Sequence, residues 1–171
     1  ARENYPDLMA IVEEKVKPDR VSLPPKNNWN RTVAKNWWLF GADRIELKKA
    51  IAHCDRVLVC SRINPHGAFT FLPSQIVYSE QLVVFPLETD SAFAILQSRN
   101  HEVWARFFSS TLGDGLRYTP SDCFQTFPFP KNWETDSTLK QIGETYYNFR
   151  ADLMVRNNEG LTNTYNRFHN P

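Results

Sequence analysis

The 171-residue sequence lacks several features that direct a chain to particular protein classes. Its cysteines are odd in number and form no CxxC pair, so we expect reduced thiols, as in a cytoplasmic protein (Cys54, Cys60, Cys123). No apolar run reaches the ~18 residues that span a bilayer, and the N-terminus carries no secretory apolar region, so no membrane contact is expected. Excess charge is missing too, because 20 Lys and Arg balance 19 Asp and Glu. A strong nonspecific nucleic-acid binder would usually be basic, yet basic residues gathered on one face could still contact DNA.

The residues that are present favour a folded domain. Hydrophobic residues make up 42% of the chain and aromatic residues 13%, which is enough to bury a core. Near the N-terminus apolar residues recur at helical spacing, and Pro18 is expected to end that helix (Tyr5, Leu8, Val12, Val16). Residues 17–36, rich in Pro and Asn, predict a linker.

The middle of the chain predicts strands followed by helices. Asp43 and Glu46 form a capping-box pattern at the start of a helix. Four β-branched and aromatic runs predict strands, at residues 56–61, 68–72, 75–78 and 81–86. Two helices follow, at about residues 90–97 and 100–110. The predicted fold class is α+β, with a small mixed β-sheet, flanking helices, and N- and C-terminal helical segments. We expect three parts: a lead-in helix and linker (1–35), a central domain (36–132) and a C-terminal helical segment (133–171).

An apolar seam runs along the last predicted helix. Its residues fall at alternating steps of three and four, which is typical of a helix that packs on another helix (Leu139, Ile142, Tyr146, Phe149, Leu153). The seam is shorter than three heptads, which favours packing within the chain over a coiled-coil dimer. Docking of a partner helix is the alternative.

Residues 101–130 carry the most specific pattern, HEVWARFF…LGDGLRYTPSDCFQTFPFP. An Arg-Tyr pair opens an aromatic run, and Pro128 and Pro130 close it as an edge or linker segment because neither has a backbone donor. This pattern resembles the target-recognition region of large bacterial adenine-N6 DNA methyltransferases, in particular the MmeI-like enzymes, which fuse modification and restriction in one polypeptide. Further segments match in the same order, namely YPDLMAIVEEKVKPDR, NWWLFGADRIELKKAI, RVLVCSRINPHGAFTFLP, DSAFAILQSRNHEVW and GLTNTYNRFHNP.

The resemblance implies a reader of double-stranded DNA, excised from a type IIG-like restriction–modification enzyme of bacterial defence. S-adenosylmethionine, and Mg²⁺ if the parent also cuts DNA, would belong to the parent enzyme, and the methyltransferase domain of the same parent chain would be a partner. No cofactor is expected in this fragment. Asn64-Pro65-His66-Gly67 lacks the second proline and the aromatic residue with which such enzymes hold a flipped adenine. Gly113-Asp114-Gly115 lacks the strand-to-helix setting of a cofactor loop. We therefore predict no catalytic residue.

Acidic and metal-ligating residues do not form a predicted site either. Asp7 with Glu13-Glu14-Lys15 mimics a nuclease pattern, but its short helical setting favours a solvated helix face. His and Cys residues are scattered without the paired spacing of zinc ligands (His53, Cys54, Cys60, His66, His101). No metal site is predicted.

Two polar, turn-like segments are candidates for reading DNA. Sequence readout needs side chains that reach base edges with defined donors and acceptors, and loops held by a sheet suit that role. The first segment supplies Arg62, Asn64 and His66. The second, by the family resemblance, supplies Gly113, Asp114, Gly115 and Arg117, with Tyr118 beside them. The turn at Asp90 and Ser91 is a weaker candidate.

Each candidate also has a structural alternative. Arg62 could pair with a carboxylate at the edge of the core, and Arg117 could anchor the aromatic run by stacking on Tyr118. Two rival functions stay open as well. One is a helical protein–protein interaction module, whose binding would depend little on salt, unlike DNA binding. The other is a small free-standing enzyme, which is disfavoured because no nucleophile–base pair stands out.

Overall fold

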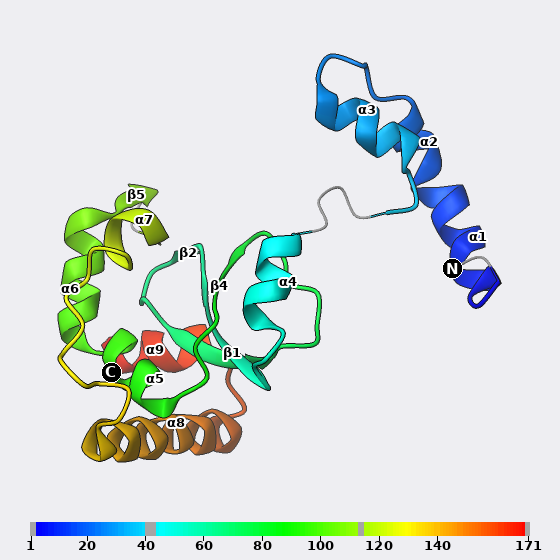
Figure 1. The fold of residues 1–171 in the computed structure, drawn as a ribbon. Coiled ribbons are helices and arrows are strands. Elements are labelled where there is room, and N and C mark those ends of the chain that lie inside the picture. The colour runs from blue at the N-terminus through cyan, green and yellow to red at the C-terminus, as the bar shows by residue number, and fades with distance from the viewer. Residues whose placement is uncertain (1–2, 40–43, 113–114, 170–171) are drawn as a thin grey trace. The chain divides into compact units, whose positions relative to one another are not determined.

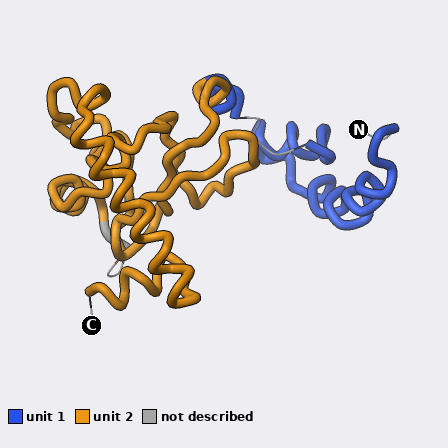
Figure 2. The backbone as a smooth tube through the Cα atoms, turned by 90° about the horizontal axis from the view of Figure 1, so that it is seen from below, with its two compact units in different colours: residues 1–49 blue, residues 50–171 orange. Residues whose placement is uncertain are grey.

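The computed structural model describes residues 3–39, 44–112 and 115–169. The chain divides into two compact units, residues 1–49 and 50–171 (Figure 2). This division does not coincide with the boundaries predicted after residues 35 and 132, and the predicted three-part organisation stays a prediction. Each unit is described by itself below.

The first unit is helical. Its helices are α1 (Pro6–Lys15), α2 (Lys17–Val21) and α3 (Asn28–Lys35). Pro18 does not end a helix as predicted, because it lies in the first turn of α2, where a missing backbone donor costs nothing. The predicted linker 17–36 is also largely helical. The side chain of Asn27 accepts a hydrogen bond from the Asn30 amide at 2.8 Å and so caps α3.

Helix α4 (Ile45–Ile51) agrees with the prediction, although its expected cap, Asp43, lies outside the described residues. The main sheet follows it. Strands β1 (Arg56–Ser61), β3 (Phe69–Pro73) and β4 (Leu82–Phe85) form an antiparallel sheet in the order β3-β1-β4 (Figure 1). β1 lies between the other two strands, and its residues 57–60 are all buried. The strand predicted at 75–78 is wrong: the segment is a turn and loop, and Ile76 and Val77 are exposed instead of packed on a sheet.

A second, smaller sheet was not predicted. It consists of β2 (Ile63–Asn64), β6 (Gly115–Arg117) and β5 (Ser110–Leu112), in the order β2-β6-β5. Helix α6 therefore ends at Phe108 instead of continuing toward the glycines. Helices beside small sheets confirm the predicted α+β class. The sheet was predicted to be mixed, but all strand pairs among the described residues are antiparallel.

Helices complete the second unit: α5 (Asp90–Leu96), α6 (Arg99–Phe108), α7 (Pro120–Cys123), α8 (Ser137–Asn157) and α9 (Leu161–His169). The two helices predicted near 90–97 and 100–110 are thus confirmed, with Thr89 and Ser98 as their capping residues. The core joins the main sheet to α5, α6 and the small sheet. It includes Leu58, Phe69, Phe85, Phe93, Leu116 and Tyr118.

The packing face of α8 differs from the predicted seam. α8 lies along α5 (Figure 1), and Gly143 is the point of closest approach. A backbone this near its neighbour leaves room only for hydrogen at that position, which turns Tyr147 and the buried Arg150 toward the core. Two residues of the seam, Ile142 and Phe149, are each more than half exposed, whereas Tyr146 of the same seam stacks on Phe93 of α5.

Among the described residues no helix is long and apolar enough to cross a membrane. The three cysteines are buried free thiols.

Candidate nucleic-acid interface

The small sheet brings the two predicted reading segments together. β2 pairs with β6 so that Ile63 lies opposite Arg117 and Asn64 opposite Leu116. The Tyr118 amide extends the ladder by donating to the Arg62 carbonyl oxygen at 2.8 Å. Residues that are directly opposite share one face of a sheet. Ile63 and Arg117 point outward and are exposed, whereas Leu116 points into the core.

The loop after β2 is held by the side chain of Asn64. Its Oδ1 accepts hydrogen bonds from the backbone amides of His66 (3.1 Å) and Ala68 (3.2 Å), and its Nδ2 donates to the Ser61 carbonyl oxygen (3.1 Å). Gly67 has a φ of 57°, a left-handed conformation that glycine adopts without strain. The Asn-Pro-His-Gly segment is therefore a turn between two strands. Asn64 uses its hydrogen-bonding groups within that turn.

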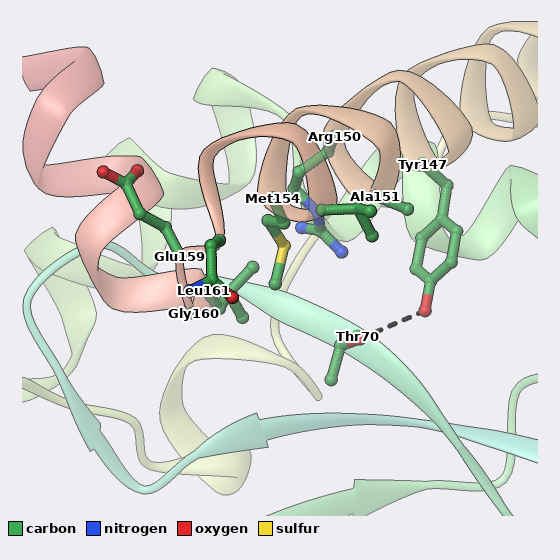
Figure 3. Close-up of a pocket in the computed structure, with 10 residues that line it drawn as sticks. Thr70, Tyr147, Arg150, Ala151, Met154, Glu159, Gly160 and Leu161 are labelled. Atoms are coloured by element: carbon green, nitrogen blue, oxygen red, sulfur yellow. Dashed lines mark hydrogen bonds between the residues drawn. The ribbon is translucent and has the colours of Figure 1, made fainter.

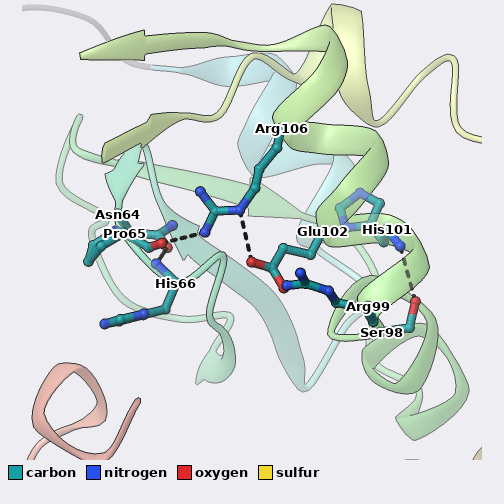
Figure 4. A network of polar contacts seen from close by, with 8 residues as sticks. All are labelled: Asn64, Pro65, His66, Ser98, Arg99, His101, Glu102 and Arg106. Carbon is teal, nitrogen blue, oxygen red and sulfur yellow. Dashed lines mark hydrogen bonds and ion pairs between the residues drawn. The ribbon is translucent and has the colours of Figure 1, made fainter. Parts of the chain in front are cut away.

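Helix α6 clamps the same loop (Figure 4). Arg106 Nη2 donates to the Pro65 carbonyl oxygen at 2.6 Å, while its Nε donates to Glu102 at 2.9 Å. Arg99 donates to the other oxygen of Glu102 at 2.7 Å. Burial raises the pKa of the Glu102 carboxyl, but the hydrogen bonds from Arg106 and Arg99 outweigh it and lower the pKa overall. The carboxylate is thus ionised and orients Arg106 toward the loop.

Helix α9 holds the loop from another side through His66. The Nε2 atom of His66 lies 2.7 Å from Asn166 Oδ1. The imidazole also stacks on His169, with ring centres 5.1 Å apart, and on Tyr165 at 5.9 Å. Neither α9 nor Arg106 was foreseen in this role. Glu102 and Arg106 stand four residues apart, which signals a helical ion pair, but nothing in that spacing points to Pro65.

The two arginines of the small sheet behave differently. Arg62 Nε donates to the backbone oxygen of Glu80 at 3.2 Å, so its partner is a carbonyl group and not the carboxylate that was considered. The side chain of Arg117 is exposed and makes no hydrogen bond, ion pair or ring contact with any described residue. Stacking of Arg117 on Tyr118 is not found. Gly115 is half-buried in β6, whereas Gly113 and Asp114 lie outside the described residues.

Tyr118 is a core residue. Its side chain is 1% exposed and packs on Phe69 and Phe85, and its hydroxyl lies 3.2 Å from His101 Nε2. His101 Nδ1 lies 2.9 Å from the Leu96 carbonyl oxygen, to which it donates. Burial lowers the pKa of His101 to about 4 despite that hydrogen bond, so the ring is neutral and Nε2 accepts from Tyr118. Burial likewise raises the pKa of the Tyr118 hydroxyl.

Asp90 and Ser91 make contacts inside the protein rather than at an exposed surface. Asp90 forms an ion pair with Arg56 at 3.0 Å, and its backbone faces Gly143 of α8. Ser91 is 2% exposed and has almost no surface with which to reach a base. The structure therefore gathers Arg62, Asn64, His66, Gly115 and Arg117 at the small sheet. Tyr118, Asp90 and Ser91 are placed in packing positions instead, and their contact with DNA stays a prediction that this geometry does not favour.

A pocket of about 700 Å³ opens beside α8, α9 and β3 (Figure 3). Arg150 lines it and is 96% buried, since its relative exposure is 4%. No carboxylate of the described residues pairs with Arg150. Its guanidinium lies instead near four aromatic rings and donates to Gln97 and Tyr165, each at 3.2 Å (Phe93, Tyr146, Tyr147, Tyr165). Cation–π contacts and neutral acceptors compensate the buried charge, which gives Arg150 a structural role between α5, α8 and α9.

No group of three or more His, Cys, Asp or Glu side chains could hold a metal ion in the part of the chain that the structure describes.

Comparisons with known proteins agree with the arrangement. A family model described as "MmeI, target recognition domain" matches residues 3–131. A solved structure of the type IIL restriction–modification enzyme MmeI in complex with DNA matches with a TM-score of 0.65 and 20% sequence identity. That match covers 90% of this chain but 19% of the MmeI chain, so this chain spans about a fifth of the matched protein. At this identity the likeness shows a shared fold. A search of curated proteins gives no match.

Proposed function

Because the chain belongs to the MmeI target recognition domain family, we propose that it is a recognition module that reads a short sequence in double-stranded DNA and makes or breaks no covalent bond itself. The observation that carries this proposal is the pairing of β2 with β6, which places Arg62, the residue before β2, beside the strand that carries Arg117. His66 lies in the loop that follows β2. The family match does not favour the alternative, a helical protein–protein interaction module.

Arg117 is the principal base-reading residue on this proposal. It is exposed on the outer face of the small sheet, and no described residue occupies its five donors. A guanidinium that is free in this way can donate two parallel hydrogen bonds to O6 and N7 of guanine in the major groove. Arg62 is tied to Glu80 by one hydrogen bond, so its remaining donors could contact a phosphate and fix the register of the module on the duplex.

The near-neutral charge of the chain fits a division of labour in a longer polypeptide. A module without an excess of basic residues contributes only part of the salt-dependent phosphate binding that dominates affinity, and supplies specificity as well. We place it in a cytoplasmic restriction–modification enzyme of bacterial defence, of type IIG organisation, whose adenine-N6 methyltransferase domain lies in the same polypeptide and uses S-adenosylmethionine. Mg²⁺ would be needed only for cleavage of DNA by that polypeptide.

The first test is selection of binding sites from a randomised duplex pool, with the wild-type chain, Arg117→Ala and Arg62→Ala. Arg156→Ala is the matched control, because the Arg156 side chain is exposed on α8 and makes no hydrogen bond, ion pair or ring contact with described residues. We expect Arg117→Ala to lose about tenfold to hundredfold discrimination at one base pair, as for a lost bidentate contact. Arg62→Ala should weaken binding to all sequences alike, and the affinity of each variant should fall as the salt concentration rises. If both variants select the same sites with the same affinity as Arg156→Ala, the reading surface lies elsewhere.

A second experiment tests the place of the module in its parent enzyme. Methylated adenines are mapped in cells that express the whole polypeptide carrying this chain, as wild type and as Arg117→Ala. A change in the methylated motif at one base supports both the reading role and the methyltransferase assignment. Intact, well-expressed protein that methylates no adenine would refute the assignment of the parent.

A further inference from the structure

A hydrogen bond from His66 to helix α9 determines which ring nitrogen of His66 carries the proton. Asn166 Oδ1 lies 2.7 Å from His66 Nε2, and the carbonyl oxygen of a carboxamide can only accept a hydrogen bond. Nε2 must therefore carry a proton. In a neutral imidazole only one nitrogen is protonated, so the other nitrogen, Nδ1, is an acceptor.

The acceptor nitrogen of His66 has no hydrogen-bond partner among the described residues. Nδ1 of His66 has no hydrogen bond to any described residue, and it is not among the buried polar atoms without a partner; Glu159 Oε2 is the single such atom in the described residues. Nδ1 is therefore unpaired among the described residues and not fully enclosed by them. In Figure 4 the His66 ring points away from the Arg106–Glu102 network that holds the loop backbone.

The position of the ring is fixed by a chain of buried contacts. Tyr165, 7% exposed, stacks on His66 and bonds through its hydroxyl to Tyr146 (2.8 Å) and Arg150 (3.2 Å). Arg150 donates to Gln97 Oε1, which also accepts the backbone amide of Phe69 at 2.9 Å. The loop after β2 is thus tied to α9 through His66 and to Gln97, at the end of α5, through Phe69. A loop held in this way can present one side chain in one orientation.

We propose that Asn166 holds the proton of His66 on Nε2 and thereby makes His66 Nδ1 an acceptor that reads the exocyclic amino group of a base. In the major groove those groups are N6 of adenine and N4 of cytosine, and no other base group there donates a hydrogen bond. The inference rests on the proposed function and deepens it. Asn166 is a positioning residue, since it acts through His66, and it lies outside residues 3–131 that match the family model. Specificity then depends on a helix beyond that matched segment.

The test is a double-mutant cycle in which His66 is changed in the protein and one amino group is removed from the DNA. Site selection with wild type and His66→Ala first locates the base pair whose preference is lost in His66→Ala. That pair is then synthesised with an analogue that lacks only the amino group, purine for adenine or pyrimidinone for cytosine. We expect the analogue to weaken wild-type binding about three- to tenfold, the range of one neutral hydrogen bond, and to leave His66→Ala unaffected.

Variants of Asn166 separate positioning from simple packing. Asn166→Ala should reduce the discrimination of wild type between the two duplexes and add nothing in the His66→Ala background. Asn166→Asp keeps an oxygen acceptor at the same place, but its carboxylate also favours the imidazolium, in which Nδ1 is a donor. It should therefore restore the discrimination only when the pH is raised until the ring is neutral. Asn163→Ala, the same substitution at an exposed position of α9 without a described contact, should behave as wild type. Thermal melts of all variants show that each is folded.

The outcomes distinguish this inference from the proposed function. If wild type selects a motif but the analogue weakens wild type and His66→Ala equally, or if Asn166→Ala discriminates as wild type does, the role of His66 and Asn166 is refuted while the module remains a DNA reader. If wild type selects no motif at any salt concentration, the proposed function fails and this inference fails with it.

Discussion

Replacing Gly143 by alanine is the sharpest test of how the C-terminal helices join the core. A Cβ atom at this position would lie 2.7 Å from the carbonyl carbon of Asp90, closer still to its oxygen, and 3.3 Å from the Cβ of Ala94. Favourable carbon contacts begin near ~3.5 Å, so α8 would have to withdraw from α5 by about 0.8 Å or more. The obstacle is backbone, which cannot rotate away as a flexible side chain can.

The expected cost follows from that displacement. A gap of 0.5–1 Å forfeits about a quarter to a half of the dispersion energy of each contact across it, and the contacts here include Tyr147 and Arg150 against Phe93. Overpacked positions typically lose about 1–3 kcal/mol. Alanine regains up to about 1 kcal/mol through its higher helix propensity, and we expect a net loss of about 2 kcal/mol.

Urea unfolding followed by circular dichroism would measure this loss as a lower midpoint with an unchanged slope. Gly160→Ala is the matched control, because a Cβ there meets nothing within 4 Å and the backbone is not left-handed. It should change stability by less than about 1 kcal/mol, in either direction. Equal midpoints for the two variants would refute the close approach of α8 to α5.

Three further predictions test the loop and the core. Burial lowers the pKa of His101 from 6.5 to about 4 on folding, so the unfolded chain binds more protons than the folded chain between these pH values. The free energy of unfolding should therefore be highest above pH 6.5 and fall by about 3 kcal/mol toward pH 4. The fall should be shallower in His101→Asn. Arg106→Ala removes the hydrogen bond to Pro65 and should speed amide exchange in the loop after β2, whereas exchange in α8 stays unchanged. Burial raises the pKa of the Cys60 thiol, so a thiol reagent should label Cys60 and the buried Cys123 only after urea unfolds the chain.

The sequence predicted the elements whose signal is local. β1 was predicted at residues 56–61 from its β-branched residues. The helices predicted near 90–97 and 100–110 correspond to α5 and α6 within two residues at each end. The small sheet was missed because its strands are two or three residues long, too short for any periodic pattern. Residues 17–36 were expected to form a linker because they are rich in Pro and Asn, yet they contain α2 and α3. Proline suits a first helical turn, and Asn27 caps α3.

The site was predictable in its residue types but not in its contacts. Glycine, asparagine and arginine next to strand ends pointed to Arg62, His66 and Arg117, and β2 and β6 bring these residues together. Tyr118 was taken for a surface residue because it follows Arg117, although alternation along a strand turns neighbouring side chains to opposite faces. The contact of His66 with α9 joins residues 100 positions apart, and no local pattern encodes it.

The small sheet is too short to be stable by itself, and this decides which of its positions can change. Two- and three-residue strands need outside support, which Leu116 and Tyr118 supply from the core and Arg106 supplies from α6. Substitution of these anchors would cost stability before it changed any contact with DNA. Arg117 lies on the opposite face and supports nothing among the described residues, so it can be exchanged at little cost to the fold. A new DNA specificity is therefore most readily reached at the outward positions of β6 and in the loop after β2, with the inward positions kept unchanged.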